Sequence, residues 1–155
     1  MKNKINLSVI IPVYNEVATC AEIIKRVQAI SIVHEIIVVD DASTDGTIHI
    51  LETINNIKVI HHEQNSGKGA AVRTGLAHVQ GNYVITQDAD LEYDPNDYLE
   101  LAEPVKNGIT KVVYGSRWLN KSIEWNPHYL INQMITLFAN VNNRYDTHQT
   151  TVVVL

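Results

Sequence analysis

Two pairs of aspartates stand where apolar runs of the chain end, and these residues could hold a divalent cation. Asp88 and Asp90 follow one apolar run, and Asp40 and Asp41 end an earlier one. In an open parallel α/β sheet, ligands bind outside the carboxyl ends of the strands, so both pairs are expected to project into one crevice. Hard divalent cations take oxygen ligands and bridge phosphates. This crevice is therefore predicted to bind a metal and a phosphorylated ligand.

The elements that must position these aspartates alternate between strand and helix. The predicted strands are Leu7–Val13, Glu35–Asp40, Ile57–His61, Tyr83–Gln87 and Lys111–Tyr114. The predicted helices are Glu16–Ile30, a run through Ile48, Leu51 and Ile54 with Ser43, Thr44 and Asp45 as its caps, Gly69–Val79, and Asn96–Lys106. Such alternation indicates the α/β class, with a mainly parallel sheet and helices on both faces.

Composition limits the classes of function. The 155 residues are 45% apolar and 19% charged, as in one soluble globular domain. A formal charge of -5 and the lack of a Lys/Arg cluster argue against nucleic-acid binding. The single cysteine, Cys20, falls within a helical pattern and is predicted to serve packing.

The apolar runs of the sequence are too interrupted to predict a transmembrane segment. Met1–Lys4 leads directly into the first predicted strand, so the sequence shows no signal peptide, and we expect a cytoplasmic protein. The window Tyr129–Val141 is the most apolar helical pattern. It is predicted to pack on the sheet, and peripheral contact with the cytoplasmic face of a membrane is the alternative.

The glycine and histidine residues match no common cofactor motif. Gly67-Lys68-Gly69 lacks the spacing of a phosphate-binding P-loop, and no dinucleotide fingerprint follows the first strand. These glycines are predicted to let a helix N-terminus approach the sheet or an anion closely. The histidines show no metal-ligand spacing, and His61-His62 is predicted to be a strand end.

A nucleotide could lie across the strand ends. Tyr14, close to the rigid Pro12, offers a surface on which a base can stack. A carboxylate such as Asp41 accepts hydrogen bonds from the ring N–H of uracil or guanine, whereas adenine has no ring N–H. Mg²⁺ or Mn²⁺ held by one or two aspartates would bridge the diphosphate and neutralise the leaving group.

Five motifs then make a family resemblance specific. They are Val9–Glu16, Val38–Thr47, Asn65–Gly69, Asp88–Asp90 and Gly115–Arg117, in this order. The chain resembles the family 2 glycosyltransferases of GT-A fold over about residues 5–120. Within that family it is most similar to the polyprenyl-phosphate sugar transferases, the dolichol-phosphate mannosyl- and glucosyltransferase-like group.

The resemblance implies a role for each matching residue. The nucleoside would be held by Pro12, Tyr14, Glu16, Val39 and Asp41. Asp88, Asp90 and Arg117 would be catalytic and would contact the nucleotide sugar, as would Lys68 and the backbone of Ala89. Asp90 and Glu92 would hold Mg²⁺ or Mn²⁺.

The implied reaction moves a sugar from a UDP- or GDP-sugar to an acceptor, a polyprenyl phosphate, with inversion at the anomeric carbon. A lipid phosphate is already ionised at neutral pH, so positioning and leaving-group stabilisation would carry the reaction without a strong general base.

The last part of the chain departs from the family pattern. Residues 5–120 are predicted to form the GT-A nucleotide-sugar-binding domain, and 121–155 a partial acceptor-side helix with an irregular tail, in the same domain. Tyr145–Thr151 differs from the acceptor-side segment of relatives, and Val152–Leu155 is expected to be a final strand with an unpaired edge. We therefore expect a truncated or diverged end.

Two other classes of function compete with a transferase. A catalytically silent nucleotide-sugar-binding fragment needs the same donor crevice, so residues 5–120 do not separate it from an enzyme. A nucleotidyltransferase on a similar sheet would carry a glycine-rich phosphate loop after its first strand, and none stands there.

Overall fold

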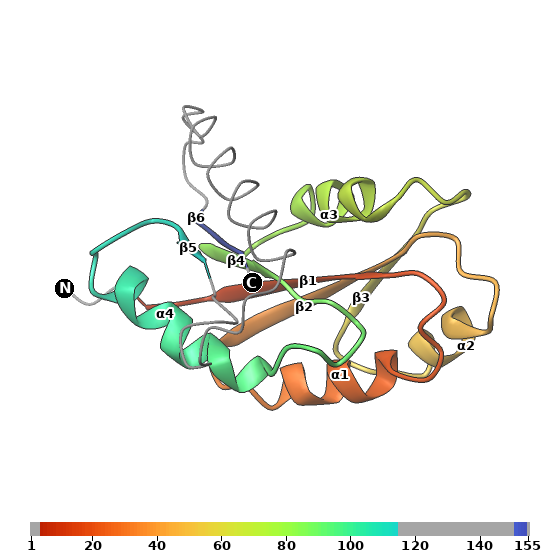
Figure 1. The fold of residues 1–155 in the computed structure, drawn as a ribbon, viewed down its shortest axis with the longest axis horizontal. Helices are drawn as coiled ribbons and strands as arrows, with labels where there is room; N and C mark the ends of the chain where they lie inside the picture. Colours follow the sequence, from red (N-terminus) through yellow and green to blue (C-terminus); the bar gives the residue numbers. More distant parts are fainter. Residues whose placement is uncertain (1–3, 115–150, 155) are drawn as a thin grey trace, which may run out of the picture. The chain divides into compact units, whose positions relative to one another are not determined.

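A computed structural model describes residues 4–114 and 151–154 of the chain, all within one compact unit formed by Met1–Gly115 and Thr150–Leu155 (Figure 1). The strands of this unit are β1 (Leu7–Val13), β2 (Val33–Asp40), β3 (Lys58–His61), β4 (Tyr83–Thr86), β5 (Val113–Tyr114) and β6 (Thr151–Val154). Its helices are α1 (Cys20–Gln28), α2 (Thr47–Leu51), α3 (Lys68–Leu76) and α4 (Tyr98–Lys106), with a 3₁₀ turn, η1 (Pro95–Asp97), before α4.

The strands form one parallel sheet in the order β3-β2-β1-β4-β6-β5. The helix α3 covers one face, and α1, α2 and α4 lie on the other (Figure 1). This confirms the predicted α/β class with helices on both faces. The central strands are continuous apolar runs because both of their faces are covered.

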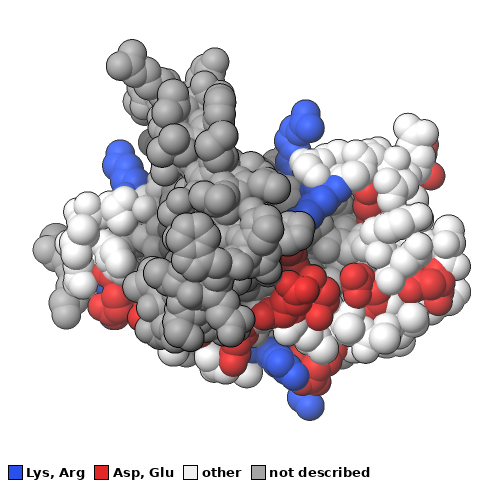
Figure 2. Space-filling view, viewed as in Figure 1, with Lys and Arg blue, Asp and Glu red and all other residues white. Residues whose placement is uncertain are grey.

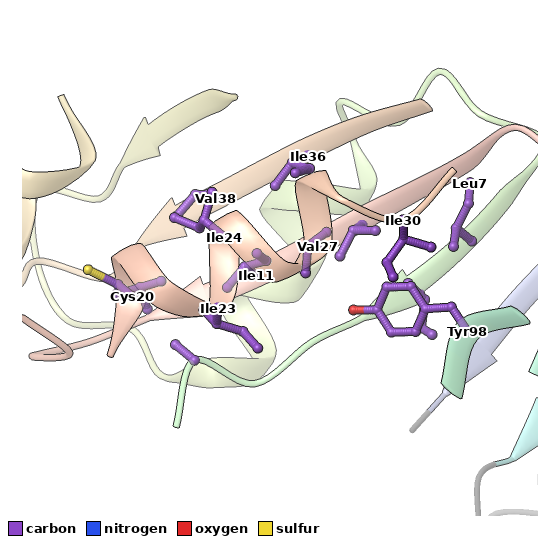
Figure 3. Packing of buried hydrophobic residues seen from close by; sticks show 14 of the residues in the cluster. Leu7, Ile11, Cys20, Ile23, Ile24, Val27, Ile30, Ile36, Val38 and Tyr98 are labelled. Carbon is purple, nitrogen blue, oxygen red and sulfur yellow. The ribbon is translucent and has the colours of Figure 1, made fainter. Parts of the chain in front are cut away.

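Helix α1 is bound to the sheet by a regular apolar stripe. Its buried residues are Cys20, Ile23, Ile24 and Val27, spaced so that they share one side of a helix. Figure 3 shows these side chains in one cluster with Ile11 of β1 and Val38 of β2. Cys20 is completely buried in this cluster, as predicted, and burial raises the pKa of its thiol.

Helix α3 approaches the opposite face very closely because of one glycine. A Cβ added at Gly75 would stand 2.5 Å from Ile10 Cγ2 of β1, whereas one added at Gly69 would meet nothing within 4 Å. The close approach to the sheet that was predicted for Gly67 and Gly69 is therefore made by Gly75 instead, and their approach to an anion stays a prediction.

Several element ends differ from the prediction. Helix α1 begins at Cys20 rather than Glu16, and α2 is only five residues long. The side-chain caps predicted for α2 are confirmed only for Asp45, whose Oδ1 accepts the N–H of Thr47, the first residue of the helix, at 3.0 Å. The N-cap position itself is Gly46, with φ 95° and no side-chain cap hydrogen bond. Ser43 and the other oxygen of Asp45 bind the loop after β1, as described below.

The expected unpaired final strand is also wrong. β6 lies inside the sheet, where it pairs in parallel with β4 on one side and β5 on the other. Residues 121–150 of the predicted tail lie outside the described residues. Among the helices of the described residues, none has the length and apolar character needed to cross a membrane.

Candidate functional site

The site region follows from the strand order. The chain moves from β1 to β2 and β3 on one side, then returns to place β4 on the other side of β1. Strand order therefore reverses beside β1, and in open α/β sheets ligands bind at such a point, outside the carboxyl ends of the strands. The residues that follow β1, β2 and β4 all lie at this edge, as predicted.

Four hydrogen bonds from backbone N–H groups to side chains join the segments that follow β1 and β2. Three N–H groups of the first loop donate to the second, and one N–H group of the second donates back. The bonds are Asn15 N to Ser43 Oγ (2.9 Å), Glu16 N to Thr47 Oγ1 (3.0 Å), Val17 N to Asp45 Oδ2 (3.1 Å) and Thr44 N to Asn15 Oδ1 (2.8 Å). The hydroxyls and carboxylate of this motif thus hold the loops together.

Backbone strain gathers in the same region. Of the four described non-glycine residues with positive φ, three follow strands at the site edge: Asn15 (56°), Ala42 (63°) and Leu91 (64°). Left-handed backbone is costly for Ala and Leu, and such strain persists where the surrounding structure enforces it, often at functional sites. It marks these three loops as candidates for ligand binding.

The loop after β4 is supported from the core by Gln87. The buried Tyr98 hydroxyl donates to Gln87 Oε1 at 2.6 Å, and Gln87 Nε2 donates to the Asp88 carbonyl at 3.0 Å. Burial raises the pKa of Tyr98, so its phenol remains a neutral donor. Gln87 therefore fixes the backbone from which Asp88 and Asp90 project.

The two aspartates of this loop have different surroundings. Asp88 Oδ1 forms an ion pair with Lys68 Nζ at 2.6 Å, a contact between the start of α3 and the end of β4. Asp90 is exposed, and its Oδ1 accepts the N–H of Glu92 at 3.1 Å. On the face seen in Figure 2, acidic side chains lie in several groups, the largest near the centre, and basic side chains lie above and below that group.

Asp90 and Glu92 provide a chemically suitable but incomplete metal site. Both side chains are exposed carboxylates on one loop. Among the residues that the structure describes, no group of three or more His, Cys, Asp or Glu side chains could hold a metal ion. Mg²⁺ commonly binds through one or two carboxylates together with substrate phosphates and water, so these two residues fit an ion that arrives with a diphosphate.

The predicted nucleoside residues are distributed between surface and core. Tyr14 is 48% exposed directly after β1, so its ring is available for stacking. Pro12 and Val39 are partners in the register of β1 and β2. The Val39 side chain is buried beneath α3 with Ala71, so only its backbone can meet a ligand.

Glu16 and Ala89 lie in the loops after β1 and β4, and their predicted contacts with a ligand stay predictions. The Glu16 carboxylate accepts from the Thr19 hydroxyl at 2.6 Å, which engages it in the loop that leads into α1. Ala89 is buried in the main core cluster, so a ligand would meet its backbone. Arg117 lies outside the described residues.

The first acidic pair does not line an open crevice. Asp40 is fully buried, and its Oδ2 accepts the N–H of Ser43 at 3.3 Å. Asp41 is only 3% exposed. The prediction that both pairs project into one crevice is therefore wrong for Asp40 and Asp41, whereas Asp88 and Asp90 do lie at the accessible edge.

Asp41 instead binds the segment that leads into α3. Its Oδ1 is 2.6 Å from His62 Nδ1 and accepts the Ser66 N–H at 3.0 Å, while Oδ2 accepts the Gly67 N–H at 2.7 Å. Burial alone would raise the pKa of Asp41, but the bonds from Ser66, His62 and Gly67 outweigh it and hold that pKa below its usual value. Reading of a base by Asp41 stays a prediction.

His62 is the residue of this region that sequence reasoning missed. His61 does end β3, as predicted, but the next residue turns its ring toward Asp41 and Thr74. A usable signal was present in the sequence, because β3 ends at the same edge as the acidic pairs.

The fold and this strand-end site define the GT-A class of nucleotide-sugar-dependent transferases. The sequence model of glycosyl transferase family 2 matches residues 8–153, and the chain belongs to that family. The match extends well beyond residue 120, so the family pattern includes β6.

Relatives and solved structures agree with this assignment. The undecaprenyl-phosphate 4-deoxy-4-formamido-L-arabinose transferase of Proteus mirabilis is 34% identical over 146 residues, which is 86% of this chain and 44% of that protein. S. aureus TarS 1–349 in complex with UDP is 25% identical, with a TM-score of 0.63 over 77% of this chain and 38% of that one.

A third protein of this fold was solved with a metal and a sugar donor. Glucosyl-3-phosphoglycerate synthase from Mycobacterium tuberculosis, in complex with Mn²⁺, UDP-glucose and phosphoglyceric acid, is 29% identical, with a TM-score of 0.60 over 74% of this chain and 45% of that one. This chain therefore spans less than half the length of these three proteins.

Proposed function

We propose that this chain forms the donor-binding part of a glycosyltransferase that takes a sugar from a UDP- or GDP-sugar. The observation that carries the proposal is the accessible acidic loop Asp88–Glu92 at the point of strand-order reversal, in a chain of glycosyl transferase family 2. Relatives of this chain were solved with UDP and with Mn²⁺ and UDP-glucose, which supports a nucleoside diphosphate and a divalent cation as the ligands.

Each side of the proposed site has a distinct task. The exposed Tyr14 ring stacks on the base, with Pro12, Glu16 and the Val39 backbone beside it. Lys68 and the Asp88–Asp90 backbone contact the diphosphate and sugar. Asp90 and Glu92 hold the cation, which when bound neutralises charge on the diphosphate leaving group. Arg117 is proposed on the family pattern alone.

The proposed acceptor is a polyprenyl phosphate, as the name of the Proteus mirabilis relative suggests. An oxygen of the acceptor phosphate attacks the anomeric carbon, the bond from that carbon to the diphosphate breaks, and the nucleoside diphosphate leaves with the electron pair. Attack from the face opposite the leaving group inverts the configuration. The acceptor oxygen is already ionised, so the protein contributes mainly orientation and charge stabilisation.

Donor binding is tested by calorimetric titration with UDP, GDP and ADP in the presence of Mn²⁺. We expect UDP or GDP to bind more tightly than ADP, since a carboxylate can accept a ring N–H from uracil or guanine. Equal affinity for all three nucleotides would leave Asp41 with a structural role alone. Absence of Mn²⁺-dependent binding of any of them would contradict the donor site.

A second candidate is donor binding without transfer, because the chain spans only 44% of its curated relative. We expect the 155-residue chain to bind the donor and to give little transfer to polyprenyl phosphate. Formation of radiolabelled glycolipid from a UDP- or GDP-sugar, measured beside donor affinity, separates the two candidates. Robust turnover by this chain would exclude the silent one.

A further inference from the structure

His62 occupies a bridging position that the proposed function has not used. Its ring is 16% exposed and lies between two polar groups, with Nδ1 2.6 Å from Asp41 Oδ1 and Nε2 2.9 Å from Thr74 Oγ1. An ionised carboxylate can only accept, so Nδ1 carries the hydrogen toward Asp41. In the neutral ring, Nε2 then accepts from the Thr74 hydroxyl.

Asp41 extends this bridge to the first residues of α3. Its carboxylate receives the N–H groups of Ser66 and Gly67, which stand just before the helix. Gly67 adopts φ 86° and ψ 158°, a backbone conformation that is open essentially to glycine. The loop is therefore held in an unusual shape by one buried carboxylate.

The conformation of the Ser66–Gly67 loop determines the position of Lys68. It follows Gly67 directly and reaches Asp88 across the edge of the sheet, Nζ to Oδ1 2.6 Å. The Lys68 side chain is 62% exposed, and an ion pair so exposed contributes little to stability. Lys68 can thus exchange Asp88 for a ligand phosphate at little cost, provided that its backbone is already in position.

We propose that His62 is a positioning residue for diphosphate recognition: through Asp41 it holds the Ser66–Gly67 loop so that Lys68 faces the acidic loop after β4. The inference rests on the proposed function, and it names a residue outside the donor-contacting set. The second ring contact, with Thr74, ties the same histidine to the body of α3, which Gly75 seats against β1. His62 therefore contacts both α3 and, through Asp41, the Ser66–Gly67 loop, and it holds the two in a fixed relative position.

The test compares uridine with UDP, both titrated in Mg²⁺ and followed by NMR. The ratio of the two affinities measures what the diphosphate adds to binding. In His62→Ala we expect this ratio to fall about tenfold, the loss of one charge-assisted contact, because UDP affinity falls by more than uridine affinity. His62→Gln keeps an N–H donor for Asp41 and should restore much of the ratio. His34→Ala, at an exposed position of β2, is the matched control.

A double variant separates positioning from general damage. If His62 acts through Lys68, His62→Ala combined with Lys68→Met should lose no more of the ratio than Lys68→Met alone. Additive losses, or a parallel fall in uridine and UDP affinity, would overturn the inference and leave the donor site itself standing. If the unmutated chain does not bind UDP more tightly than uridine, both the His62 inference and the proposed donor site are overturned.

Discussion

Tyr98 of α4 donates its phenol hydrogen to Gln87 Oε1 at 2.6 Å, and both side chains are almost fully buried. This bond connects α4 to Gln87, the residue that precedes the acidic loop Asp88–Glu92. The Gln87 amide uses its other end to donate to the carbonyls of Asp88 and Tyr93. The shape of the candidate cation loop therefore depends on a contact inside the core.

Tyr98→Phe should destabilise the protein by about 1–3 kcal/mol, because it leaves the buried Gln87 oxygen without its donor. Urea unfolding at neutral pH measures this loss. We also expect weaker Mn²⁺-dependent UDP binding, since the loop becomes less fixed. Tyr14→Phe, at an exposed ring, serves as the stability control and should change the free energy of unfolding by less than about 0.5 kcal/mol. If the two variants lower the free energy of unfolding equally, the hydrogen bond from Tyr98 to Gln87 does not stabilise the loop as described.

Gly75→Ala should cost about 1–3 kcal/mol of stability, because the new methyl group would lie 2.5 Å from Ile10 Cγ2 and force α3 away from β1. Gly69→Ala is the matched control within the same helix. Its methyl group meets nothing within 4 Å, so the better helix propensity of alanine should make it neutral or stabilising by up to about 1 kcal/mol. Thermal unfolding of both variants checks the opposite signs.

Asp90→Asn should abolish the Mn²⁺ dependence of UDP binding while leaving the fold intact. The side chain is exposed, and exposed substitutions usually change stability by less than about 0.5 kcal/mol. Titration of UDP with and without Mn²⁺ measures the effect, and Asp97→Asn is a control at another exposed aspartate. Unchanged metal dependence in Asp90→Asn would remove this residue from the cation site.

Acid should destabilise the protein through two carboxylates of the loop after β2. The pKa values of Asp41 and Asp45 are both lowered in the folded chain, Asp41 by hydrogen bonds that outweigh its burial and Asp45 chiefly by the Thr47 hydroxyl. In the unfolded chain these carboxylates have the ordinary aspartate pKa of about 3.9, so the unfolded chain takes up protons at higher pH than the folded chain. Their stabilisation is present above that pH and is lost as the pH falls through the folded pKa values.

Urea midpoints between pH 6 and pH 2.5 measure this loss. Asp41→Asn should be less stable than the unmutated chain at neutral pH and should lose less on acidification. Asp97→Asn should follow the unmutated chain. Parallel pH profiles for the unmutated chain and Asp41→Asn would show that Asp41 does not carry the dependence.

Most of the sheet could be predicted from sequence because its strands are continuous apolar runs. The limits of β1 and the end of β2 at Asp40 were found in this way. The start of α1 was misplaced, since Asn15, Glu16 and Val17 give their N–H groups to side chains of the segment after β2. Tertiary hydrogen bonds outweighed local preference there.

The sequence predicted the position of a site residue only where the end of a single strand determines that position. Asp88 and Asp90 follow β4 and lie at the edge as expected. The burial of Asp41 could not be predicted in the same way, because its partners, His62 and Gly67, belong to other segments. For His62 the one sequence signal is that β3 ends at the same edge as the acidic pairs, and Gly67 has no such signal. Both contacts depend on how β3 and α3 meet β2.

The position of β6 bears on the order in which the chain can fold. β5 is joined to the sheet through β6, and β6 is the segment furthest along the sequence. During synthesis, β1 to β4 can therefore pair before residues 151–154 leave the ribosome, whereas β5 and the side of β4 that binds β6 can pair only after that. Long-range parallel pairing of this kind is slow, and β4 would be the strand exposed to association with other chains in the interval.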